Sequence, residues 1–127
     1  MRDELVDLVA GRIDSELSRI NAMGDPELLA AIQPWLDART GEGLYSANLN
    51  DRFLEWMHST LLPQLRRLGE TGQRTWDAIC DPSSAITKER IASIVLVVAV
   101  LSGLQNLDIS TLVAIVVMAI RSKTRRP

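Results

Sequence analysis

The side chains that most often carry chemistry are scarce in this chain of 127 residues. It has one histidine, His58, and one cysteine, Cys80. A Ser-His-Asp or Cys-His site would need His58, which flanks an apolar helical stripe and is therefore expected to be a partly buried structural residue. Cys80 has no basic residue beside it to stabilise a thiolate, and a single thiol is typical of a reducing cytoplasm. These residues do not predict nucleophilic catalysis.

Two pairs of acids are spaced four residues apart, Asp3 with Asp7 and Asp51 with Glu55. This spacing places both carboxylates on one helix face, where such a pair can hold a divalent metal, although a solvated surface is the simpler interpretation. The glycines of "GEGLY" and "GETGQR" lack the Gly-Lys-Ser/Thr of a phosphate loop and are interpreted as turns. We therefore expect no enzyme, no cofactor and no metal site.

Charge is divided unevenly along the chain. The 14 basic and 16 acidic residues give a net charge of −2, which argues against nucleic acid as a partner. Residues 1–80 hold eight basic and thirteen acidic residues, whereas residues 81–127 hold six basic and three acidic residues. The N-terminal "MRDELVDLV" has acids where a signal peptide has a basic region, so the N-terminus is expected in the cytoplasm.

Periodic apolar residues predict an amphipathic helical bundle over residues 1–82. Stripes spaced three and four residues apart occur over residues 3–22 and again over residues 54–68. Between them, Asp25 is the predicted N-cap of a helix that runs to about residue 39. Asn48 or Asn50 is the predicted N-cap of the next helix, which contains the second stripe and runs to about Leu68.

Prolines and glycines interrupt this region. Pro34 and Pro63 are each expected to bend or kink a helix. Residues 40–50 and 69–72 are expected to be loops, and a short helix precedes the boundary at residues 81–84. Each of the three tryptophans is expected to anchor a small core between helices: Trp35, Trp56 and Trp76.

A long apolar run, Ile91–Ile120, dominates the C-terminal part, residues 83–127. Its thirty residues contain one charge, Asp108. The polar stretch "QNLD" divides the run into pieces of fourteen and twelve residues, 91–104 and 109–120. With Gly103 as the stop of the first piece and Asp108 as the N-cap of the second, the pattern predicts an apolar helical hairpin. The whole chain is expected to be all-α.

Two other structures were considered for the apolar run. One continuous helix of thirty residues would be about 45 Å long, which exceeds a hydrocarbon core of about 30 Å. A β-hairpin is suggested by the many β-branched residues, but neither piece alternates and the polar break lacks a two-residue turn. Each hairpin helix would span only about 18–21 Å, which is short for a crossing.

Two functions remain open. In the first, the hairpin anchors in or perturbs a membrane from the cytoplasmic face of the inner or plasma membrane, with residues 1–82 as a partner-binding or regulatory cap. The flanking cations fit the positive-inside pattern, and the tail could attract anionic lipid: Lys88 and Arg90 before the run, then Arg121, Lys123, Arg125 and Arg126 after it. In the second, the protein is a soluble cytoplasmic assembly module that buries the hairpin in a homo-oligomer or a larger complex.

Under both interpretations the same side chains are expected to make the membrane or oligomer contact: Ile94, Val95, Val98, Val113, Val116 and Val117. Leu96, Val100, Ile115 and Val116 are expected in an apolar environment. The distinguishing observation is what covers the valines at positions 95, 98, 113 and 117. Cover by residues 1–80 of the same chain would indicate an ordinary soluble domain, and bare side chains would indicate a missing lipid or partner.

Overall fold

The computed structural model describes residues 2–38, 48–83, 85–101 and 107–124, except the side chains of residues 2, 3 and 5–10. The described elements are all helices, so the all-α expectation is confirmed. Because residues 88–98 and 109–124 are helical, the β-hairpin alternative is excluded. The elements in chain order are α1 (Arg2–Asn21), α2 (Asp25–Asp37), α3 (Leu49–Trp56), η2 (Met57–Leu61), α4 (Leu62–Arg67), α5 (Glu70–Cys80), α6 (Lys88–Val98) and α7 (Ile109–Thr124).

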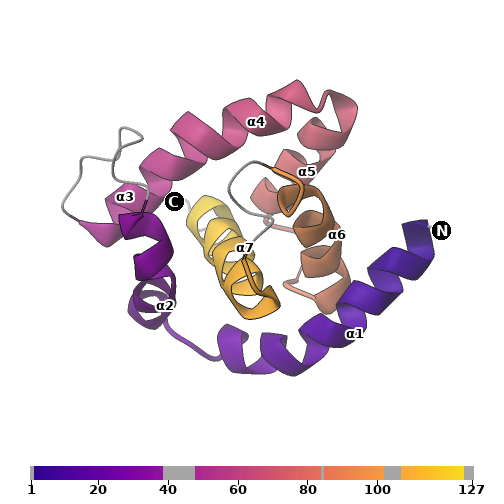
Figure 1. Cartoon of the computed structure of the whole chain (residues 1–127), viewed down its shortest axis with the longest axis horizontal. Coiled ribbons are helices and arrows are strands. Elements are labelled where there is room, and N and C mark those ends of the chain that lie inside the picture. Colours follow the sequence, from indigo (N-terminus) through magenta and orange to yellow (C-terminus); the bar gives the residue numbers. More distant parts are fainter. Residues whose placement is uncertain (1, 39–47, 84, 102–106, 125–127) are drawn as a thin grey trace.

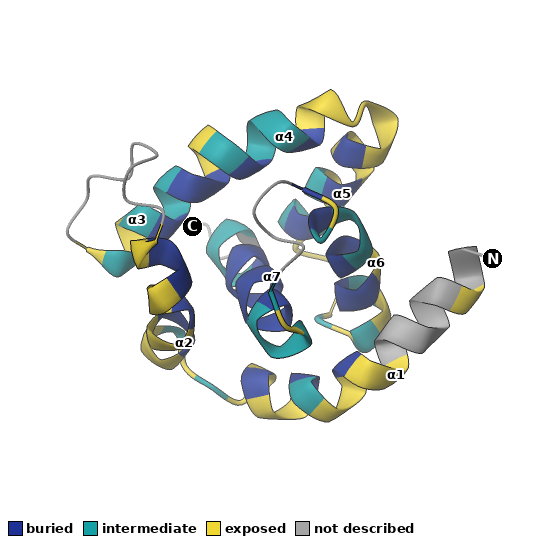
Figure 2. Ribbon diagram, in the orientation of Figure 1, coloured by how far each residue is buried: buried dark blue, intermediate teal, exposed yellow. Residues whose placement is uncertain are grey.

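Helix α7 lies in the centre of the molecule, and the other helices surround it (Figure 1). It contacts α1, α2, α5 and α6. Nine consecutive residues of α7, Leu112–Ile120, are buried on every side of the helix (Figure 2). A helix buried all round must be apolar all round, so the position of α7 explains its composition.

The cover of the apolar helices comes from the same chain. Helix α6 packs against α1, α5 and α7, and one hydrophobic core combines residues from both parts of the sequence. The four distinguishing valines, at positions 95, 98, 113 and 117, are at most 3% exposed. In this conformation, helices of the same chain cover the apolar side chains of α6 and α7 that were expected to meet a lipid or a partner. That α6 and α7 form a separate hairpin unit remains a prediction.

Helix α6 is shorter than the sequence suggests, and α7 is longer. Helix α6 ends at Val98, after which the amides of Val100 and Leu101 bond three residues back, to Val97 and Val98. Closely spaced β-branched residues favour helix only weakly, which is consistent with this tightening. The predicted stop at Gly103 lies outside the described residues. Helix α7 continues to Thr124, so two of the basic residues form its last turn.

The ends of the helices in the N-terminal half agree only partly with the sequence pattern. The N-cap of α2 is Gly24 rather than Asp25, and Glu27 Oε1 accepts a hydrogen bond from the Gly24 amide. Of the two predicted caps of α3, Asn48 and Asn50, the structure has Asn48, because its side chain accepts from the amide of Asp51. Pro34 lies inside α2 without ending it.

The predicted kink at Pro63 takes the form of a π-helical turn. The residues before it, Met57–Leu61, form η2, and the Leu62 amide bonds to the carbonyl of Met57 five residues back. A proline has no amide proton and its ring crowds the carbonyl four residues earlier. A wider turn before the proline relieves that crowding while the chain continues as α4.

The residues expected as one glycine turn, 69–72, play two different roles. Gly69 forms the turn, with φ of 65°, a conformation that favours glycine. Gly72 lies inside α5 and is buried. A Cβ at position 72 would lie 1.6 Å from the carbonyl oxygen of Leu65, so its interpretation as a turn is wrong: here glycine allows α5 to approach α4 closely.

The tryptophans do not each anchor a separate core. Trp35 of α2 and Trp56 of α3 meet edge to face with ring centroids 4.7 Å apart, and Phe53 lies 5.7 Å from Trp56. These rings therefore join α2 to α3 in one cluster. Trp76 of α5 is half-buried and lies elsewhere, next to His58.

Candidate functional site

The residues expected to contact a membrane or a second copy lie inside the protein. Their exposed fractions range from 0 to 3% for Ile94, Val95, Val98, Val113, Val116 and Val117. In this conformation they contact neighbouring helices of the same chain. The predicted contact therefore requires a conformation in which α6 and α7 leave their cover.

The more exposed side of α6 is also largely apolar. We call Ser93, Leu96 and Val97 of α6, together with Val100 in the turn that directly follows the helix, the outer face of α6. The side chain of Val100 is 68% exposed, and Leu96 and Val97 are half-buried. The expectation that Val100 lies in an apolar environment is therefore wrong for the isolated chain, although it is correct for Ile115 and Val116.

A shallow cleft of about 110 Å³ separates α5 from α6 beside this face. Sites for drug-sized ligands are commonly ~300–1,000 Å³, so the cleft suits one side chain or the end of one acyl chain instead. Its apolar floor continues the outer face of α6. The lining residues are Thr71, Arg74, Thr75, Ala78, Ser93, Ile94 and Val97.

Arg90 fastens the start of α6 to the end of α5. Its guanidinium donates to the carbonyl of Ala78 from Nη2 at 2.6 Å and from Nε at 3.0 Å, and to the carbonyl of Asp81 at 2.8 Å. The last carbonyls of a helix lack partners within that helix, and a cation there also interacts favourably with the helix dipole. Arg90 therefore stabilises the C-terminal end of α5.

Arg121 does the same at the other end of the apolar run. It donates to the carbonyl of Met23 at 2.7 Å and to that of Asn21, the last residue of α1, at 2.8 Å. It also lies 3.3 Å from Asp25 at the start of α2. Its guanidinium thus has protein partners at the junction of α1 and α2, and an anion contact by Arg121 remains a prediction.

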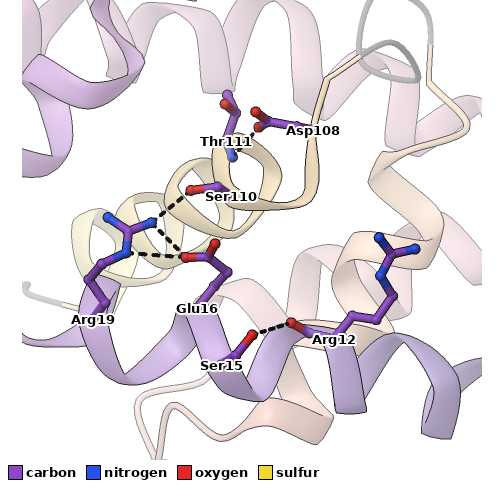
Figure 3. A network of polar contacts seen from close by, with 7 residues as sticks. All are labelled: Arg12, Ser15, Glu16, Arg19, Asp108, Ser110 and Thr111. Atoms are coloured by element: carbon purple, nitrogen blue, oxygen red, sulfur yellow. Dashed lines mark hydrogen bonds and ion pairs between the residues drawn. The ribbon is translucent and has the colours of Figure 1, made fainter.

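The N-terminal end of α7 is attached to α1 by exposed polar groups (Figure 3). Arg19 donates to Ser110 Oγ at 2.9 Å and to Glu16 at 2.6 Å. Asp108 accepts from the amide of Thr111 at 2.8 Å, as expected of an N-cap. Hydrogen bonds from the side chain and the amide of Thr111 hold the pKa of Asp108 below its usual value of 3.8.

The C-terminal end of α7 brings together three side chains that are distant in sequence. Lys123 Nζ lies 3.2 Å from His58 Nε2 and 5.4 Å from the ring centroid of Trp76. The rings of His58 and Trp76 are 6.1 Å apart. His58 is exposed, so the expectation that it is partly buried is wrong. The remaining tail cations, Arg125 and Arg126, lie outside the described residues.

The candidates for metal binding are not brought together. In the described part of the chain, no group of three or more His, Cys, Asp or Glu side chains is placed to hold a metal ion. Asp51 is exposed and Glu55 half-buried, while the side chains of Asp3 and Asp7 lie outside the described residues.

Sequence reasoning missed two kinds of functional contact. Arg90 was interpreted only as a flanking charge and Arg121 as a flanking charge that contacts an anion, although cations that border a buried segment can also reach the ends of neighbouring helices. The contact of His58 with Lys123 joins residues 65 positions apart and has no signal in the sequence. No protein-family model, curated protein or solved structure matches the chain.

Proposed function

We propose that this chain is a non-enzymatic helical protein that associates with a membrane surface through the outer face of α6. Helices of residues 1–82 serve as the cap that keeps α7 covered. The observation that carries the proposal is the apolar outer face of α6, with Val100 68% exposed. The expected location is the cytoplasmic face of the inner or plasma membrane.

The contrast between the two apolar helices supports this choice. Burial on all sides accounts for the composition of α7. Helix α6 is buried on one side only, and a helix in that position normally carries polar residues on the other side. From Ile91 to Leu101 the only polar residue is Ser93. Helix α6 is therefore more apolar than its place in the fold requires, which suggests a second apolar environment.

The size of the outer face favours lipid as that environment. Helix α6 has 11 residues and is about 16 Å long, whereas a stable protein interface buries about 800 Å² per partner. A lipid surface requires no matching partner surface. Within the described residues, no helix combines the length and the apolar composition needed to cross a membrane. The proposed contact is accordingly interfacial, and the basic tail would add attraction to anionic lipid of about 1 kcal/mol per charge.

A second copy of the chain is the other candidate occupant, as in a soluble assembly module. Ser93, Leu96 and Val100 are spaced three and four residues apart and form one stripe along α6. In a two-fold antiparallel pair, the small Ser93 of one copy would face Val100 of the other, with Leu96 near the axis. The short stripe makes this association weak.

Vesicle flotation tests the proposal with a matched pair of variants. Wild-type protein is expected to float with vesicles of mixed anionic and neutral lipid, and Val100→Ser to bind about tenfold more weakly, since burying a valine contributes about 1.5–3 kcal/mol. Leu68→Ser is the control, because Leu68 is an exposed leucine that caps the end of α4 and is not part of the outer face of α6. If all three proteins float equally well, or if none of them floats with the vesicles, the membrane proposal is contradicted.

Sedimentation equilibrium without lipid tests the second candidate. Dimerisation of the wild type that Val100→Ser abolishes and Leu68→Ser leaves intact would establish the second copy as the occupant. If the wild type remains monomeric at all concentrations, a second copy is excluded as the partner of the outer face.

A further inference from the structure

The contact between His58 and Lys123 at the end of the central helix depends on whether the histidine carries a proton. We propose that His58, Lys123 and Trp76 form a proton-sensitive clasp that holds the C-terminal end of α7 against η2 and α5 at neutral pH and loosens in mild acid. The inference goes beyond the proposed membrane association and involves no lipid.

The geometry requires a neutral histidine. A lysine ammonium carries only donors, so at 3.2 Å the Nε2 atom of His58 must accept and therefore carries no proton. Protonation would place two cations at this separation. Histidine is the side chain whose ordinary pKa places its change of charge between pH 5 and 8, and His58 is the only histidine in the chain. The clasp therefore has a single proton-dependent member.

Trp76 makes the contact more than an isolated surface hydrogen bond. Lys123 Nζ lies 5.4 Å from the centroid of its ring, a distance at which a cation is attracted to an indole face. The rings of His58 and Trp76 meet in an edge-to-face arrangement with their centroids 6.1 Å apart. One half-buried ring of α5 thus holds both other members in place. Repulsion between protonated His58 and Lys123 would disturb all three contacts.

The position of His58 in the chain also sets it apart. It lies in the five-residue π-helix η2, and π-helical turns are rare and frequent at functional sites. An acidic side chain near the clasp would favour a protonated histidine, and a cation would disfavour it. The charged residues of the surrounding elements are Glu55 on α3, Asp77 on α5, and Arg66 and Arg67 in the last turn of α4.

Two neighbouring cations therefore anchor α7 differently. Arg121 stays charged at every relevant pH and holds the junction of α1 and α2. Lys123, two residues later, holds η2 and α5 only while His58 is neutral. Mild acid would loosen one side of the last turn of α7 and leave the other attached.

Thermal unfolding at pH 7.5 and pH 5.5, followed by circular dichroism without lipid, tests the clasp. On acidification the Tm of the wild type is expected to fall by about 2 °C more than that of Lys123→Met or His58→Gln, a size appropriate to an exposed pair. Lys88→Met is the matched control, since Lys88 is the other lysine of the chain and lies at the start of α6. On acidification, the Tm of Lys88→Met is expected to fall by the same amount as that of the wild type.

Hydrogen exchange of residues 119–124 provides a local measurement. After correction for the intrinsic rate, these amides are expected to exchange faster at pH 5.5 than at pH 7.5 in the wild type, and equally at both pH values in Lys123→Met. The same pH dependence in the wild type and Lys123→Met, or its persistence in His58→Gln, would overturn the inference. Because no vesicle is present, that result would leave the proposed membrane association untouched.

Discussion

Replacing Gly72 by alanine is the sharpest test of the way the helices close around α7. In an ordinary helix interior, Gly→Ala stabilises by about 0.5–1 kcal/mol. Here the added Cβ would lie 1.6 Å from the carbonyl oxygen of Leu65 and 2.5 Å from its carbonyl carbon. Ordinary van der Waals contact begins near 3.4 Å, and the obstacle is backbone rather than a flexible side chain. Helices α4 and α5 must therefore move apart.

The expected cost follows from that displacement. Overpacking in a core costs about 1–3 kcal/mol, and a clash with backbone belongs at the upper end. We expect Gly72→Ala to lower the free energy of unfolding by about 3 kcal/mol, measured by urea denaturation with circular dichroism. Gly11→Ala in α1 is the control, because nothing lies within 4 Å of a Cβ there, and it should stabilise slightly. If both variants stabilise alike, α5 does not approach α4 as described.

Three further predictions concern α7 and its ends. Arg121→Met should lower the free energy of unfolding, measured by urea denaturation, by about 2 kcal/mol, because it removes charge-assisted hydrogen bonds from a side chain that is 18% exposed. Arg74→Met is the control: its side chain is 74% exposed, and the free energy of unfolding should change by less than about 0.5 kcal/mol. Equal effects would contradict the anchoring role of Arg121. Val116→Asp should bury an unpaired carboxylate and abolish the helical circular dichroism signal of the whole protein, and a folded variant would show that residue 116 faces water. The pKa of Asp108 is lowered in the folded state, so its contribution to stability is present above pH 3.8 and is lost as the pH falls through the folded value. Below about pH 4, the free energy of unfolding should therefore depend less steeply on pH in Asp108→Asn than in the wild type. The same pH dependence in both proteins would contradict the hydrogen bond between Asp108 and Thr111.

Local patterns in the sequence predicted the helical class and several features of the helices. The apolar period indicated helices in the N-terminal half, and the caps at Asn48 and Asp108 are visible as side chains before apolar runs. The polar break at residues 105–108 correctly separated two helices. These features depend on neighbours within one or two turns, which a sequence displays directly.

Features that depend on distant partners could not be predicted in the same way. The sequence shows that residues 112–120 are apolar all round, but both lipid and a protein interior satisfy that pattern. Only the packing of α1, α2, α5 and α6 shows that this chain supplies the cover. Gly72 resembled a turn residue because its reason, the approach of the Leu65 carbonyl, lies in another helix.

The residues of the candidate site were even harder to predict from the sequence, because their exposure depends on distant helices. The sequence pattern predicted six contact residues in the apolar run, and all six are buried. The exposed apolar side chain is instead Val100, in the turn that follows α6. Which side of α6 faces outward is decided by the positions of α1, α5 and α7. A pattern without a polar face contains no information about that orientation.

Hydrogen exchange measured with and without anionic vesicles tests the central claim most directly, because it reports on α6 and α7 separately in one experiment. The account predicts that lipid slows exchange of the α6 amides, residues 88–98, while residues 112–120 of α7 stay as protected as in the free protein. Slowed exchange in α6 with unchanged α7 would show contact through the outer face over a covered core. Unchanged exchange in α6, or a loss of protection in α7 on addition of vesicles, would contradict it.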